Sequence, residues 1–249
     1  MYAFVSLAWF LFLSYPNPLV SSKSYNEIQR FNGLIFVEGF SQDIKNRAMS
    51  NDANDLKLLF HQLGIMSVSL QNAGELTSDM ASKLPNWYSS KEGLTGESPA
   101  VFGGCGMSFT QAGDSIAPQP IQATKRKEEH DLRLKFQNLS SDLASAACAL
   151  DPIGISANLD LACDAIDKLV GANPEEALCS QLVQALHGCG QDLVDYGELL
   201  CAEDSKSKDD KSSAGRILAQ AGQEVRNAGD AFSTIPWAVL HEQLRLNNH

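Results

Sequence analysis

The chain has 249 residues, with 19 basic and 30 acidic side chains and a formal net charge of −11. Apolar residues make up 44% and charged residues 20%, a balance that supports a folded core and argues against wholesale disorder. Contacts with polyanions need clustered Lys and Arg, so the acidic balance argues against binding to nucleic acid or to an anionic membrane surface. We therefore expect a protein partner and no nucleic acid.

The first 22 residues carry no charged side chain. Residues 3–13 are apolar apart from Ser6, and Pro16 would end a helix there. A helix of that length rises only about 16 Å, too little for a hydrocarbon core of about 30 Å. The length fits the apolar region of a signal peptide, although no Lys or Arg precedes it. A buried N-terminal segment is the alternative, and the absence of a later apolar run of span length predicts no integral membrane span.

Residues 23–121 predict a small α/β unit. The run Gly33-Leu-Ile-Phe-Val37 is typical of a buried strand, and the alternation of Met66, Val68 and Leu70 indicates a second strand. Between them, apolar residues at helical spacing predict a helix that is capped at residues 50–52 and stopped by Gly64. A further helix over residues 75–84 and a Gly/Ser/Pro-rich tail over 86–121, with a third strand at 100–102, complete the unit.

Residues 122–249 predict an antiparallel four-helix bundle, because apolar residues recur there every three or four positions. Breaks at Asp151-Pro152, at Asn173-Pro174 and over residues 202–215 separate four stripes. This region holds 12 basic and 20 acidic side chains, so we expect most of the net charge to lie on the surface of the bundle. The predicted fold class is α+β and predominantly helical. The stripes are Leu132, Phe136, Leu139, Leu143 and Ala146; Ile155, Leu159, Ala162, Ile166 and Val170; Leu178, Leu182, Leu186, Cys189, Leu193, Tyr196 and Leu200; and Leu218, Ala221, Val225, Ala228 and Phe232.

The order of features over residues 33–79 is an apolar strand, a polar loop, a helix containing Asp55-Leu56 and Leu63-Gly64, a second strand, and Glu75-Leu-Thr77. This order resembles the start of a caspase-like peptidase domain, of the caspase and metacaspase fold. The resemblance implies that Cys148 stands at the position of the catalytic nucleophile. The family's histidine is missing at residues 104–106, and Ala149-Leu150 follows Cys148 in place of Arg-Gly. The chain therefore resembles a non-catalytic homologue that acts by protein–protein interaction in cell death or protease regulation.

Two other interpretations stay open. The chain is either an exported or soluble acidic helical module that binds or scaffolds without enzymatic activity, or an active cysteine endopeptidase. Its six cysteines would form three disulfides in an exported protein and buried thiols otherwise, and none has the C-x-x-C spacing of a metal site. We predict no metal and no cofactor. The caspase-like interpretation implies a cytoplasmic protein, a signal peptide at residues 1–22 implies a secreted one, and the oligomeric state is left open.

Overall fold

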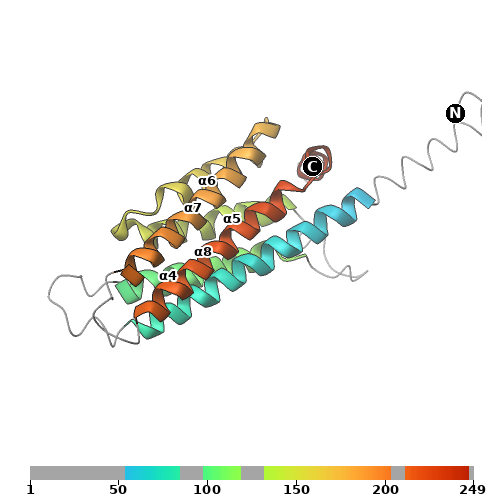
Figure 1. Ribbon diagram of the computed structural model, residues 1–249. Helices are drawn as coiled ribbons and strands as arrows, with labels where there is room; N and C mark the ends of the chain where they lie inside the picture. The colour runs from blue at the N-terminus through green and yellow to red at the C-terminus, as the bar shows by residue number, and fades with distance from the viewer. Residues whose placement is uncertain (1–53, 85–97, 119–131, 203–210, 247–249) are drawn as a thin grey trace, which may run out of the picture. The chain divides into compact units, whose positions relative to one another are not determined.

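The computed structural model describes residues 54–84, 98–118, 132–202 and 211–246, and residues 54–249 form one unit of the chain. Throughout these described residues the secondary structure is helical, without a strand (Figure 1). The 3-10 turn η2 (Asp151–Ile153) connects α5 to α6. The α-helices are an unlabelled helix over residues 54–83, α4 (Ser98–Ile116), α5 (Leu132–Leu150), α6 (Ala157–Leu169), α7 (Glu176–Ala202), α8 (Lys211–Ser233) and α9 (Trp237–Leu246).

Neighbouring helices run antiparallel, as contacts between them show. The Ser67 hydroxyl donates to the Gly113 carbonyl at 2.7 Å and joins the helix over residues 54–83 to α4. The Ser115 hydroxyl donates to Asp142 at 2.7 Å and joins α4 to α5. At the other end of the bundle, the Asn158 amide of α6 donates to Asp192 of α7 at 2.7 Å. Second points of contact give the directions: Gly74 lies against Gly106, Gly104 lies against Ala149, and Gly190 and Gly197 of α7 lie against Gly222 and Gly215 of α8. In each of these pairs, earlier residues of one helix meet later residues of the next, so the two helices are antiparallel.

Aromatic side chains close the core between helices that are distant in sequence. The rings of Phe102 in α4 and Tyr196 in α7 lie 5.8 Å apart, and those of Phe136 in α5 and Phe232 in α8 lie 6.1 Å apart. Three of these rings are almost fully buried, and they lie within one continuous apolar core shared by all the helices. Such tilted pairs add a favourable ring geometry to the burial of apolar surface. The core thus ties the early helices to the late ones.

Glycines at seven-residue spacing bring two helix pairs into close contact. A Cβ added at Gly190 of α7 would lie 2.5 Å from the carbonyl oxygen of Gly222 in α8, and one added at Gly197 would lie 2.5 Å from that of Gly215. The same approach occurs between Gly74 and α4. Residues seven apart stay on one face of a helix, so the glycines form a continuous seam along which the two backbones approach.

The helical bundle predicted for residues 122–249 fits the structure. Helices α5 to α8 coincide with the four apolar stripes, and almost every member of those stripes is buried. The bundle is larger than four helices, because α4, α9 and the helix over residues 54–83 pack into the same core. The residues of α9 that pack into this core are Leu240 and Leu244, which are buried.

The predicted strand–helix–strand unit is wrong over the described residues. Residues 54–83 form one uninterrupted helix, so Gly64 does not stop it and residues 66–70 are not a strand. Met66 and Leu70 are fully buried whereas Val68 is 54% exposed, which is the pattern of a helix and not of an alternating strand. The third strand predicted at residues 100–102 lies inside α4. Residues 1–22, the strand at 33–37 and the cap at 50–52 lie outside the described residues.

Candidate functional site

Cys148, the predicted nucleophile position, lies in the last turn of α5. Its side chain is exposed and unpaired, while the preceding Ala147 faces the core. Among the described residues Cys148 has no hydrogen bond to a histidine, and a cysteine nucleophile needs such a base within reach. The position offers an accessible thiol on a helix surface, and the catalytic role suggested by the resemblance stays a prediction.

The other cysteines are free thiols in less accessible positions. Cys105 and Cys189 are fully buried, and burial raises the pKa of both thiols well above the ordinary value of 9.0. Burial also raises the pKa of Cys163 and of Cys179 to about 11. Because the thiolate is the nucleophile, these four positions are suited to packing and not to attack on a substrate. All six cysteines lie within the described residues and are free thiols there.

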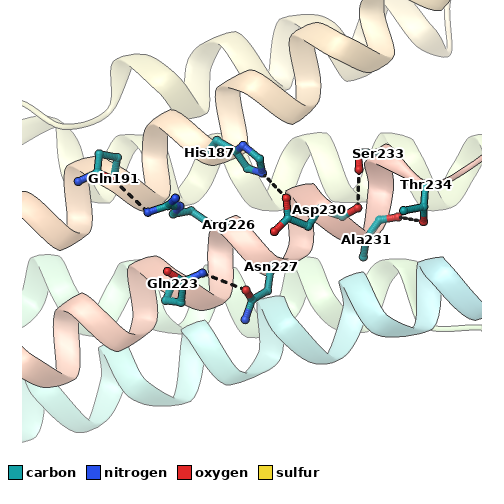
Figure 2. Close-up of polar contacts among 9 residues, drawn as sticks. All are labelled: His187, Gln191, Gln223, Arg226, Asn227, Asp230, Ala231, Ser233 and Thr234. Atoms are coloured by element: carbon teal, nitrogen blue, oxygen red, sulfur yellow. Dashed lines mark hydrogen bonds and ion pairs between the residues drawn. The ribbon is translucent and has the colours of Figure 1, made fainter.

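His187 of α7 lies over the backbone of α8 (Figure 2). Its Nε2 atom is 3.0 Å from Oδ1 of Asp230, although the two atoms lack hydrogen-bond alignment. The side chain fits there because residue 229 is a glycine, since a Cβ at that position would meet the imidazole ring at 2.7 Å. Cys189 points into the core, so its closeness to His187 in sequence does not make a catalytic pair.

Figure 2 shows further polar contacts, of which one joins α8 to α7 and the others lie within residues 223–234. Arg226 donates to the Gln191 side chain at 3.1 Å, and Gln223 donates to Asn227 at the same distance. The hydroxyls of Ser233 and Thr234 both donate to backbone carbonyls in the last turn of α8. Both hydroxyls drawn beside the His187–Asp230 contact are therefore engaged with the backbone, and the hydrogen bond from Arg226 to Gln191 joins α8 to α7.

The helix over residues 54–83 carries a second, outward face that we call the outer stripe. It consists of six exposed residues at alternating spacings of three and four: Leu58, His61, Ile65, Val68, Asn72 and Glu75. Its apolar members are Leu58, Ile65 and Val68, which are 37%, 40% and 54% exposed. The opposite side of this helix supplies Leu59, Leu63 and Met66 to the core. The helix thus has a buried apolar face and an outer row of three apolar and three polar residues, whereas an ordinary surface helix is apolar on one face alone.

Sequence reasoning missed the outer stripe because Ile65 and Val68 lay within or beside a predicted strand. The signal was nevertheless present, since positions 58, 61, 65, 68, 72 and 75 follow the a and d positions of a heptad. Elsewhere the exposed large apolar residues stand apart on separate helices, for example Met107 on α4, Leu161 on α6 and Leu199 on α7. Single residues of that kind are normal on a protein surface, and an ordered row is not.

The described residues contain no group of three or more His, Cys, Asp or Glu side chains that could hold a metal ion. Over the same residues, no helix combines the length and the apolar character that crossing a bilayer requires. The sequence matches no family model, no curated protein and no solved structure. The function is therefore inferred from the outer stripe and the charge of the chain itself.

Proposed function

We propose that the chain is an acidic helical module that binds another protein through the outer stripe of the helix over residues 54–83. The observation that carries this proposal is the exposure of Leu58, Ile65 and Val68 in one row on a helix whose opposite face is already buried. Burying apolar surface contributes about 25 cal/mol per Å². A bound helix would cover all three side chains at once and gain that contribution from each.

The form of the stripe supports a helical partner. Spacings of three and four residues place its members in a straight line along the helix, which is the geometry used when two helices pack side by side. The net charge of −11 argues against a polyanion as the occupant of the surface. An apolar row in an otherwise polar surface is typical of a protein–protein interface.

Binding to a protein is common to two of the interpretations drawn from the sequence. The resemblance to caspase-like proteins stays a prediction, and its link to cell death or protease regulation has not been tested. The helical module does not depend on that resemblance, because the outer stripe lies within described residues and needs no strand. We therefore propose the binding role without assigning the process in which it acts.

A site-specific photocross-link tests the proposal. A photoreactive phenylalanine analogue replaces Ile65 in one variant and Leu161 in a matched control, since Leu161 is an exposed apolar residue on a different helix. We expect irradiation of an extract of the producing cells to give a discrete protein adduct from position 65 alone. Adding Val68→Lys should abolish the adduct, because a charge in the apolar row opposes burial. Equal adducts from both positions, or none from position 65, would contradict the proposed role.

A further inference from the structure

From the charge and spacing of the outer stripe we infer that its occupant is a second copy of the same chain, paired antiparallel to the first. This inference rests on the proposed binding role of the stripe and identifies the partner. The stripe follows three successive heptads, the last one incomplete, with Leu58, Ile65 and Asn72 at a positions and His61, Val68 and Glu75 at d positions. When two identical helices pair antiparallel, each a residue faces a d residue of the other copy.

In the antiparallel register, each residue of the stripe lies opposite a residue of a different number in the other copy. Ile65 faces Val68 of the other copy, and by symmetry Val68 faces Ile65, so the most exposed apolar residues meet at the centre. His61 faces Asn72, which pairs two polar side chains at the next layer. Each contact occurs twice about a two-fold axis, as the self-complementary interface of a symmetric dimer requires.

Charge selects the antiparallel orientation over the parallel one. Lys57 lies beside Leu58 at one end of the stripe, and Glu75 lies at the other end. In this register Leu58 of one copy faces Glu75 of the other, and Lys57, the residue next to Leu58, comes near that Glu75 carboxylate twice in each dimer. A parallel pair would instead set Glu75 against Glu75, and like charges at a helix interface are unfavourable.

Both charged residues are available for such contacts. Lys57 and Glu75 are exposed, and neither has an ion pair among the described residues. Two other charged residues of this helix are already paired, because Lys83 contacts Asp79 at 2.5 Å. Lys57 and Glu75 are thus the complementary pair that the outer stripe presents to a second copy.

The contact is short, so the dimer should be weak. The stripe from residue 58 to residue 75 spans about 26 Å at 1.5 Å per residue. Two helices touching over that length bury less than the roughly 1,200 Å² at which stable interfaces begin. We expect a dissociation constant on the order of 10 µM, as for other small and reversible interfaces.

Sedimentation equilibrium of the purified full-length chain tests the inference between about 1 and 300 µM. We expect the mean mass to rise with concentration from 27.0 kDa toward twice that value. Ile65→Lys and Val68→Lys should each weaken the dimer more than tenfold, while Leu161→Lys should leave it unchanged. Far-ultraviolet circular dichroism checks that each variant stays helical. A wild-type chain that is monomeric throughout the range, or a dimer insensitive to both stripe variants, would overturn the inference.

A charge exchange tests the orientation. Lys57→Glu and Glu75→Lys should each weaken the dimer by roughly threefold to tenfold, because each replaces two attractive contacts with two repulsive ones. The double variant should recover the wild-type dissociation constant in the antiparallel dimer. In a parallel dimer Lys57 and Glu75 lie at opposite ends of the interface and never meet, so a double variant that shows no recovery over the single variants would refute the antiparallel register.

The two proposals can fail separately. If the chain is monomeric but the photocross-link at position 65 captures a different protein, the stripe binds a protein and the inference of a second copy is wrong. If no adduct forms at position 65 in the extract and the purified chain is monomeric, the proposed role of the stripe fails as well.

Discussion

At the scale of single residues, the glycines of the α7–α8 seam decide how closely the two helices approach. A Cβ at Gly222 would overlap the carbonyl oxygen of Gly190 and lie 3.0 Å from the backbone nitrogen of Val194. Because both neighbours lie in a helix backbone, the clash can be relieved only by moving the helices apart. We expect Gly222→Ala to lower the free energy of unfolding by about 1–3 kcal/mol, measured by urea denaturation.

Gly103 of α4 supplies the matched control. A Cβ there would meet only the Ala81 side chain, at the ordinary contact distance of 3.9 Å. Alanine is a better helix former than glycine, so Gly103→Ala should stabilise the chain by up to about 1 kcal/mol. A stabilising effect of Gly222→Ala equal to that of Gly103→Ala would show that the close approach of α7 and α8 is not required.

At the scale of the elements, the sequence predicts the late helices well and the early ones poorly. Helices α5 to α8 follow their apolar stripes because Leu and Ala recur at helical spacing between clear proline or polar breaks. The early region was harder to predict because glycine occurs both in turns and at positions where two helices pack closely. Gly64 and the glycines of residues 103–106 look like turn signals, whereas in the structure they lie inside helices. Gly106 is needed for close packing, since a Cβ there would lie 2.7 Å from the Gly74 carbonyl oxygen.

The candidate site was harder to predict than the fold for a related reason. The alternation of Met66, Val68 and Leu70 fits a strand, and a strand would place Val68 on the same buried face as Met66 and Leu70. Only the longer period, with Leu59, Leu63 and Met66 inside, shows that Val68 points outward. A local pattern of five residues is too short to distinguish the two periods, and the tertiary contacts decide between them.

The helical assignment of residues 66–70 gives a direct prediction. Met66 is fully buried and Val68 is 54% exposed, whereas a strand would place both on one face. Met66→Lys should cost about 3 kcal/mol or more, because it places an unpaired charge in the core. Val68→Lys should change the unfolding free energy by less than about 0.5 kcal/mol. Urea titrations at low micromolar concentration, where the chain is monomeric, measure both, and equal losses would contradict the helix.

At the scale of the whole molecule, the buried thiols make stability depend on alkaline pH. Both Cys163 and Cys179 have a pKa of about 11 in the folded chain, against an ordinary value of 9.0. Below about pH 9 these thiols are protonated in both states and have no effect on stability. Between pH 9 and 11 the unfolded chain releases protons that the folded chain retains, so the free energy of unfolding falls.

Three further groups shape that dependence. Burial raises the pKa of Cys105 and of Cys189 as well, so these thiols act in the same direction. Lys135 acts in the opposite direction because burial lowers the pKa of its amine, which donates to the Ala117 carbonyl at 2.6 Å. Four thiols outweigh one amine, so the net effect of rising pH should be destabilising.

Urea midpoints at pH 8, 9, 10 and 11 measure this effect on the intact chain. The wild type should keep a constant midpoint up to about pH 9 and then lose stability steadily. The double variant Cys163→Ala and Cys179→Ala should lose less over the same interval, because two of the four thiols with raised pKa are gone and neither side chain is fully buried. Identical pH dependence in the two proteins would mean that these thiols titrate alike in the folded and unfolded chains, and the packing of α6 and α7 around them would have to be looser than the structure shows.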